Sequence, residues 1–110
     1  MNTTELNNFV RKYFDQTLIR RQAGIICHDT NSSKEHRRLV LEICEWAAEN
    51  NMDFFTRVCL KGNEIADVVI PELSCPIIEI RYSEKKTKEY LSEYDDLRQY
   101  VETKDPFKLR

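Results

Sequence analysis

Two carboxylates stand inside short apolar segments of this chain. Asp67 lies in ADVVI and Glu79 lies in IIEIR, and hydrophobic packing gives no reason for an acid at either position. Charged groups removed from water need a partner, and a divalent cation is a common partner for two acids that come together. Because side chains alternate along a strand, Glu79 and Arg81 face the same way. These three residues predict a polar, cation-binding site on a β-sheet.

The pattern around these residues predicts three strands. Strands over 54–60 and 65–70 form a hairpin through a tight turn at 61–64. Pro76 opens a third strand that runs to residue 82, and proline suits a strand end because it has no amide hydrogen to donate. The two acids therefore belong to the second and third strands.

Apolar residues at helical spacing predict three helices. They cover residues 4–20, 33–51 and 84–101, and Ser32 with Glu35 has the spacing of a capping box at the start of the second helix. The third helix is predicted from an apolar stripe that would face the sheet. This stripe consists of Tyr90, Tyr94, Leu97 and Val101.

Length and composition indicate one α/β domain. The chain has 110 residues, of which 41% are hydrophobic, and this suffices for one core but not for two. We expect a small mixed sheet of three strands flanked by helices, with room for a short fourth strand in the tail, residues 102–110. No segment offers the ~20 apolar residues that span a bilayer, and the N-terminus lacks a secretion-signal pattern. A soluble cytoplasmic protein is the expectation.

The cysteines and histidines do not form a recognisable metal or nucleophile motif. No two of the four cysteines have C-x-x-C spacing, so buried reduced thiols are the favoured interpretation. Cys27 and His28 are adjacent and supply two metal ligands at most. Histidine titrates near neutral pH, but neither His28 nor His36 has a serine, cysteine or carboxylate arrangement that would build a nucleophile. Packing or capping roles are therefore favoured for both.

Basic residues form local clusters, although the formal net charge is −2. A negative balance argues against binding nucleic acid through bulk electrostatics. Local clusters still suit contacts with phosphates, and the alternative is that each cluster is an ordinary solvated face. The candidates for nucleic-acid contact are Arg37, Arg38, Lys61, Lys85 and Lys86.

The order of these elements resembles a known family. A helix, a hairpin carrying Asp67, a strand carrying Glu79 and Arg81, and a final helix resemble the restriction-endonuclease-like nuclease superfamily, in particular its small archaeal members of the Holliday-junction-resolvase type. The motif of that superfamily is written PD-(D/E)xK, and the resemblance covers residues 33–101. It makes Asp67 the motif aspartate and Glu79 the second acid. Ala66 replaces the motif proline, and Arg81 stands where the family has lysine.

The resemblance implies a DNA endonuclease that depends on Mg²⁺ or Mn²⁺ and works as a homodimer, with branched DNA as the implied substrate. An acid on the helix before the first strand would complete the metal site. Glu42 is preferred for its distance from that strand, and Glu35, seven residues earlier, lies on the same side of the helix. The metal would lower the pKa of a bound water and stabilise the charge that grows on the scissile phosphate.

The presence of Arg81 in place of the motif lysine leaves alternative functions open. Arg81 binds phosphate through its fork of donors but stays protonated, so it cannot act as a base. An amine would then have to come from Lys61, Lys85 or Lys86. The alternative functions are a nuclease-fold module that binds nucleic acid or protein without cutting, and an oligomerising structural protein. For Glu79 itself, the plain alternative to a metal is an ion pair with Arg81 or Arg57.

Overall fold

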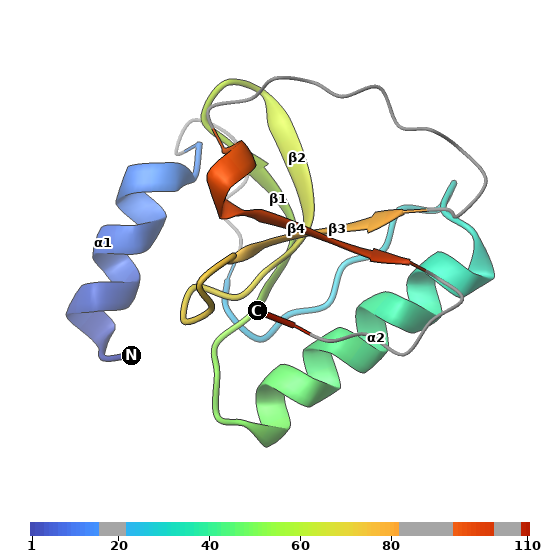
Figure 1. Ribbon diagram of the computed structural model, residues 1–110, viewed down its shortest axis with the longest axis horizontal. Helices are drawn as coiled ribbons and strands as arrows, with labels where there is room; N and C mark the ends of the chain where they lie inside the picture. Colours follow the sequence, from blue (N-terminus) through green and yellow to red (C-terminus); the bar gives the residue numbers. More distant parts are fainter. Residues whose placement is uncertain (16–21, 82–93, 103–108) are drawn as a thin grey trace.

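The computed structural model describes residues 1–15, 22–81, 94–102 and 109–110. A four-stranded sheet separates two helices, with α1 (Thr3–Tyr13) against one face and the longer α2 (Lys34–Glu49) against the other (Figure 1). The sheet contains both antiparallel and parallel neighbours. The expected α/β class with a small mixed sheet and flanking helices is therefore confirmed.

Helix α1 is shorter than the predicted helix over residues 4–20. It begins with a capping box in which the Asn2 side chain accepts from the backbone of Glu5 and the Glu5 side chain accepts from the backbone of Asn2. It ends at Tyr13, because Phe14 takes an extended conformation and forms an antiparallel bridge with Leu60. The prediction was thus wrong for Phe14 and Asp15, and residues 16–21 lie outside the described part of the chain.

Helix α2 closely matches the predicted helix over 33–51. Its N-cap is Ser33, whose hydroxyl accepts a hydrogen bond from the backbone N–H of His36 at 3.1 Å. The predicted capping box of Ser32 with Glu35 is therefore wrong by one residue.

Three antiparallel strands confirm the predicted hairpin and third strand. They are β1 (Phe55–Leu60), β2 (Glu64–Val69) and β3 (Ile77–Arg81), and they lie side by side in that order. The turn between β1 and β2 has positive φ at Gly62 (89°) and Asn63 (65°), which are residue types that tolerate the left-handed region. Asp67 and Glu79 therefore occupy neighbouring strands, as predicted.

The C-terminal part of the predicted third helix is wrong. After a single 3₁₀ turn at Asp95–Leu97 the chain forms a fourth strand, β4 (Arg98–Glu102), which pairs in parallel with β3. The spacing of Leu97 and Val101 fits a helix, but alternation along β4 buries Gln99 and Val101 on one face. The possible fourth strand is thus present, although it precedes the tail instead of lying within it. Residues 82–93 lie outside the described part of the chain.

A buried glutamine fastens the end of the chain to the sheet. Gln99, only 2% exposed, donates to the carbonyls of Cys75 (2.6 Å) and Arg110 (2.9 Å) and accepts from the N–H of Arg110 (3.0 Å). Both the amide nitrogen and the amide oxygen of Gln99 therefore have hydrogen-bond partners. These bonds offset most of the free-energy cost of burying a polar side chain.

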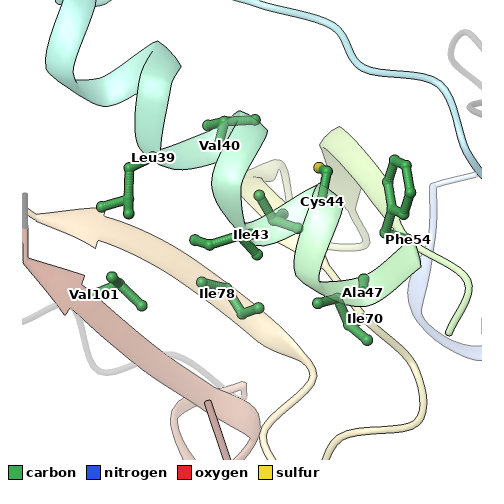
Figure 2. Close-up of a cluster of buried hydrophobic side chains, with 10 residues drawn as sticks. Leu39, Val40, Ile43, Cys44, Ala47, Phe54, Ile70, Ile78 and Val101 are labelled. Atoms are coloured by element: carbon green, nitrogen blue, oxygen red, sulfur yellow. The ribbon is translucent and has the colours of Figure 1, made fainter. Parts of the chain in front are cut away.

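The main core lies between α2 and the sheet, as Figure 2 shows. One stripe of α2 points at β3 and β4, where Ile43 meets Ile78 and Leu39 lies over Val101. Phe54 and Ile70, which flank the strands, close the other end of this cluster. A second cluster fills the space between α1 and the opposite face of the sheet, and it contains Val10, Phe14, Phe55, Val58, Leu60, Ala66, Val69, Ile77 and Tyr94.

The β1–β2 hairpin changes face in its middle. Val68 packs against α2, whereas Ala66, two residues earlier on the same strand, packs in the cluster beneath α1. Residues two apart on a regular strand face the same side, so the hairpin must twist between them. Asp67 lies at this point on β2, and Arg57 lies there on β1 with a left-handed φ of 47°. Because of this twist, the side chain of Asp67 does not follow the regular alternation between the two faces of the sheet along β2.

Neither α1 nor α2, nor any other helix among the described residues, has the length and hydropathy of a membrane span.

The backbone of Arg57 predicts an unusual order of stability. At a regular strand position glycine is less stable than alanine, but the left-handed region costs an L-residue roughly 1 kcal/mol or more that glycine avoids. We expect Arg57→Gly to unfold with a free energy about 1 kcal/mol higher than Arg57→Ala, measured by urea titration. Both variants lack the arginine side chain, so each controls for its loss. The opposite order would show that residue 57 does not require a left-handed backbone.

Candidate functional site

Asp67 is held by two other elements of the fold. One carboxylate oxygen, Oδ2, accepts a hydrogen bond of 2.8 Å from the backbone N–H of Ile80 on β3. The other oxygen, Oδ1, lies 3.3 Å from Nε2 of His36 on α2. The side chain is 24% exposed, so it remains open to solvent or a ligand on one side. Each oxygen keeps a second lone pair for a further contact.

Glu79 lies beside Asp67, and the sheet buries most of its carboxyl group. Burial raises the pKa of Glu79 to about 8, and the negative charge of Asp67 acts in the same direction, while Arg98 partly opposes it. A hydrogen bond between the two acid side chains also favours the protonated form. At neutral pH the pair therefore carries a proton that a cation would displace.

A buried arginine from β4 balances the acids. The side chain of Arg98 is 8% exposed, and it forms ion pairs with Glu64 (3.2 Å), Asp95 (3.4 Å) and Glu79 (3.9 Å). Burial alone would lower the pKa of Arg98, but the hydrogen bond to Glu64 and the charges of Glu79 and Glu64 outweigh it and leave this pKa raised. Arg98 is thus a permanent cation beside the carboxylate pair.

Glu79 has a different ionic partner from those considered in the sequence. Among the described residues, its ion pair is with Arg98 and not with Arg81 or Arg57. The distance of 3.9 Å between Arg98 Nε and Glu79 Oε1 is too long for a hydrogen bond. Arg57 instead approaches Asp29 at 4.0 Å. The carboxyl group of Glu79 is therefore not locked in a hydrogen-bonded salt bridge.

The predicted helix acids lie at the surface of α2. Glu42 and Glu35 are both exposed on α2. Within the described residues, no three histidine, cysteine or acidic side chains converge closely enough to hold a metal ion by themselves. The structure brings Asp67 and Glu79 together, but it does not bring either helix glutamate to them in such a group.

His36 is a side chain of α2 that contacts Asp67. Sequence reasoning assigned it a packing or capping role because no carboxylate was visible near it. In the fold, the side chain contacts Asp67, and the other ring nitrogen, Nδ1, is buried without a hydrogen-bond partner among the described residues. The sequence held one signal for this contact. His36 lies three residues after the N-cap of α2, on the stripe of the helix that faces the sheet.

His36 and Asp67 also line a pocket of about 280 Å³ beside the hairpin twist. Its wall combines polar and apolar side chains from the segment before α2, from α2 itself and from the β1–β2 hairpin. The lining residues are Cys27, His28, Asp29, Ser32, His36, Val40, Arg57, Ile65 and Asp67. Ligands can therefore reach Asp67 from this side.

Arg81 faces a tyrosine instead of an acid. Its guanidinium carbon lies 3.9 Å from the centre of the Tyr100 ring on β4. In the described part of the chain, Arg81 forms no ion pair, and its Nε is buried without a hydrogen-bond partner. No carboxylate among the described residues therefore neutralises the positive charge of Arg81.

The predicted nucleic-acid contacts fall into different surroundings. Lys61 donates to the carbonyl of Arg11 at the end of α1 (2.7 Å), and Arg37 donates to the carbonyl of Ser32 just before α2. Both side chains therefore have structural tasks. Arg38 is exposed on α2. Lys85 and Lys86 lie outside the described residues.

The four cysteines, all of them among the described residues, form no disulfide. Cys44 is buried in the core beneath α2, and burial raises the pKa of its thiol to about 12. The other three are partly buried. The expected burial is therefore complete only for Cys44.

The chemistry of the donor set fits a hard divalent cation. Mg²⁺ is commonly bound through one or two carboxylates, with water and substrate phosphates completing its shell, so a cage of three protein ligands is not required. Asp67 and Glu79 supply two carboxylates on adjacent strands, and the raised pKa of Glu79 shows that a second negative charge beside Asp67 is unfavourable without a cation. These two residues would hold the ion.

A scan against protein-family models, a search of curated proteins and a search of solved structures found no match to this chain.

The raised pKa of Glu79 predicts that stability falls with increasing pH. The folded state keeps this proton up to about pH 8, whereas an ordinary glutamate loses it near 4.5. Between these values the folded state binds more protons than the unfolded state, so the free energy of unfolding decreases as pH rises, by at most about 1.4 kcal/mol per pH unit. Urea unfolding of the wild type and of Glu79→Gln over this range measures the difference.

Glu79→Gln should lack the part of the pH dependence of unfolding that comes from the proton of Glu79. Glu42→Gln removes an exposed glutamate from α2 and should retain the wild-type slope. Parallel pH profiles for Glu79→Gln and the wild type would contradict a protonated Glu79 at neutral pH.

Proposed function

We propose that this protein is a metal-dependent DNA endonuclease of the restriction-endonuclease-like type. The observation that carries the proposal is the buried pairing of Glu79 with Asp67, which raises the pKa of Glu79 to about 8. Two acids in such a setting favour a divalent cation, because the cation removes both the repulsion and the need for the proton. Mg²⁺ or Mn²⁺ is the proposed cofactor, and a homodimer is proposed from the family resemblance.

The order of the elements supports the finer fold assignment. Helix α2 precedes three antiparallel strands, Asp67 lies on β2, and Glu79 and Arg81 lie two residues apart on β3. A further strand, β4, follows and joins the edge of β3. The resemblance implies this order for the helix, the hairpin and the third strand, while most of the final helix that it implies falls on residues 82–93, outside the described part of the chain.

The residues of the chain prepare the site in distinct ways. The Ile80 N–H and His36 orient Asp67 from opposite sides, and Glu79 gives up its proton when the cation binds. Arg98 limits the excess charge of the acids in the absence of an ion. When bound, the metal lowers the pKa of a water molecule and stabilises the charge on the phosphate. Arg81 remains protonated and contributes a positive charge toward phosphate, but not a base.

A second function is favoured by a specific observation. Arg81, which replaces the motif lysine, is stacked against Tyr100, and Glu42 is exposed instead of joining the carboxylate pair. These features also suit a module that binds nucleic acid without hydrolysing it. The two functions make different predictions for cleavage.

Cleavage assays test the nuclease directly. The wild type should cut supercoiled, single-stranded or four-way-junction DNA with Mg²⁺ or Mn²⁺ and should be inactive in EDTA. Asp67→Asn and Glu79→Gln should lose activity by on the order of 100-fold or more, because each removes a charge that holds the metal. Glu42→Gln is the matched control on α2 and should remain active. Binding without cutting by the wild type would favour the non-hydrolytic module.

Metal binding should be visible in stability. A ligand that binds only the folded state adds about 2.7 kcal/mol at 100 times its Kd. Because the ion displaces the proton of Glu79, the apparent affinity for Mn²⁺ should rise as pH increases toward 8. Thermal melting at increasing Mn²⁺ concentration, repeated at several pH values, measures both effects.

The same variants locate the ion. Glu79→Gln should bind Mn²⁺ more weakly and should lose most of the pH dependence, whereas Glu42→Gln should retain both. If millimolar Mn²⁺ produces no shift in the wild type, or the same shift in Glu79→Gln, the metal is not held by this pair.

A further inference from the structure

An exposed tyrosine and an arginine form a stacked pair on the sheet. Tyr100 is 47% exposed, which is unusual for a large aromatic side chain in the middle of a strand. The guanidinium carbon of Arg81 lies 3.9 Å from its ring centre, over one face of the ring. Such a pair combines an accessible aromatic surface with a cation that no carboxylate among the described residues neutralises.

The pair lies next to the two acids. Tyr100 on β4 is the direct Cα partner of Glu79 on β3, and Arg81 follows Glu79 by two residues on the same face. Neighbouring strands are ~4.8 Å apart, so the backbone of Tyr100 lies one strand spacing from that of Glu79. Arg98 precedes Tyr100 by two residues and lies on that face as well. The ring therefore shares a face of the sheet with Glu79, Arg81 and Arg98.

We infer that Tyr100 and Arg81 stack with an unpaired nucleobase beside the scissile phosphodiester, so that single-stranded or locally unpaired nucleic acid is the preferred substrate. The inference rests on the proposed function for the position of the reacting phosphate. Aromatic rings and arginine planes both stack with bases, and every base offers a face, so this contact needs no particular sequence. Bases within a duplex are already stacked on their neighbours and cannot use it.

The chemistry of the pair favours this ligand over an apolar peptide. The positive charge of Arg81 attracts the phosphates that flank a base, while the ring supplies the stacking surface. An apolar side chain would gain from the ring but would have to leave the guanidinium desolvated without a partner. Nucleic acid satisfies both groups at once.

Binding of labelled oligonucleotides tests the inference. In EDTA, where cleavage is excluded, the wild type should bind a single-stranded oligonucleotide more tightly than the matching duplex, measured by fluorescence anisotropy at fixed salt. Tyr100→Leu should weaken single-strand binding about tenfold, equivalent to about 1.4 kcal/mol, with little change for the duplex. Tyr100→Phe keeps the ring and should bind within about twofold of the wild type.

Matched controls separate stacking from general damage. Leu41→Ala removes an exposed apolar side chain of similar exposure (41%) from α2 and should leave binding unchanged. Melting temperatures of all variants verify that they fold. Equal affinities of Tyr100→Leu and the wild type for the single strand, or equal losses for single strand and duplex, would overturn the inference, as would failure of the wild type to bind single strands.

Cleavage assays with Mg²⁺ distinguish this failure from failure of the proposed function. If the wild type cuts DNA but Tyr100→Leu keeps the same preference between single-stranded and duplex substrates, the nuclease stands and the stacking pair does not. If nothing is cut but Tyr100→Leu selectively loses single-strand binding, the stacking pair stands without hydrolysis.

Discussion

The structure depends on how a sheet interior accommodates the carboxyl group of Glu79 beside Asp67. Two acids in such surroundings repel each other and lose hydration, and the fold offsets this with a raised pKa of Glu79, a backbone N–H that donates to Asp67 and the buried cation of Arg98. Arg98 reaches the acids only because β4 pairs in parallel with β3. Asp67 is free of the regular strand alternation because the hairpin twists at its position, with Arg57 held in a left-handed backbone.

This arrangement carries a cost that a binding site would explain. Burial of Glu79 opposes its ionised form at neutral pH, and the Nδ1 of His36 and Nε of Arg81 are buried without hydrogen bonds among the described residues. Polar groups left in such a state are unfavourable, and they cluster around one end of the β2–β3 pair. Two apolar clusters, one under each helix, supply the stability that offsets them. Strain and unsatisfied groups concentrated in one place are characteristic of functional sites.

Much of the sheet was predictable, since strand alternation, turn residues and terminal prolines are local signals. The two acids were predictable for a related reason, because a carboxylate inside an apolar strand stands out against its neighbours. The contact of His36 with Asp67 and the strand at Arg98–Glu102, where the end of the last helix was expected, were not predicted. Glu42 has a suitable distance along the chain, but α2 turns His36 toward Asp67 instead. The segment from Asp95 to Glu102 has apolar residues that satisfy both helical and strand periods, and pairing with β3 decides between them.

The amino-acid order alone established an α/β chain with a hairpin, a third strand and two acids on adjacent strands, because these features follow from neighbours within a few residues. Tertiary packing decided which side chains meet those acids. His36, Arg98 and Tyr100 come from distant parts of the chain, and nothing in their local sequence distinguishes them from ordinary packed or solvated residues. Their roles arise from contacts between elements, which depend on the register of β4 and on the orientation of α2 over the sheet.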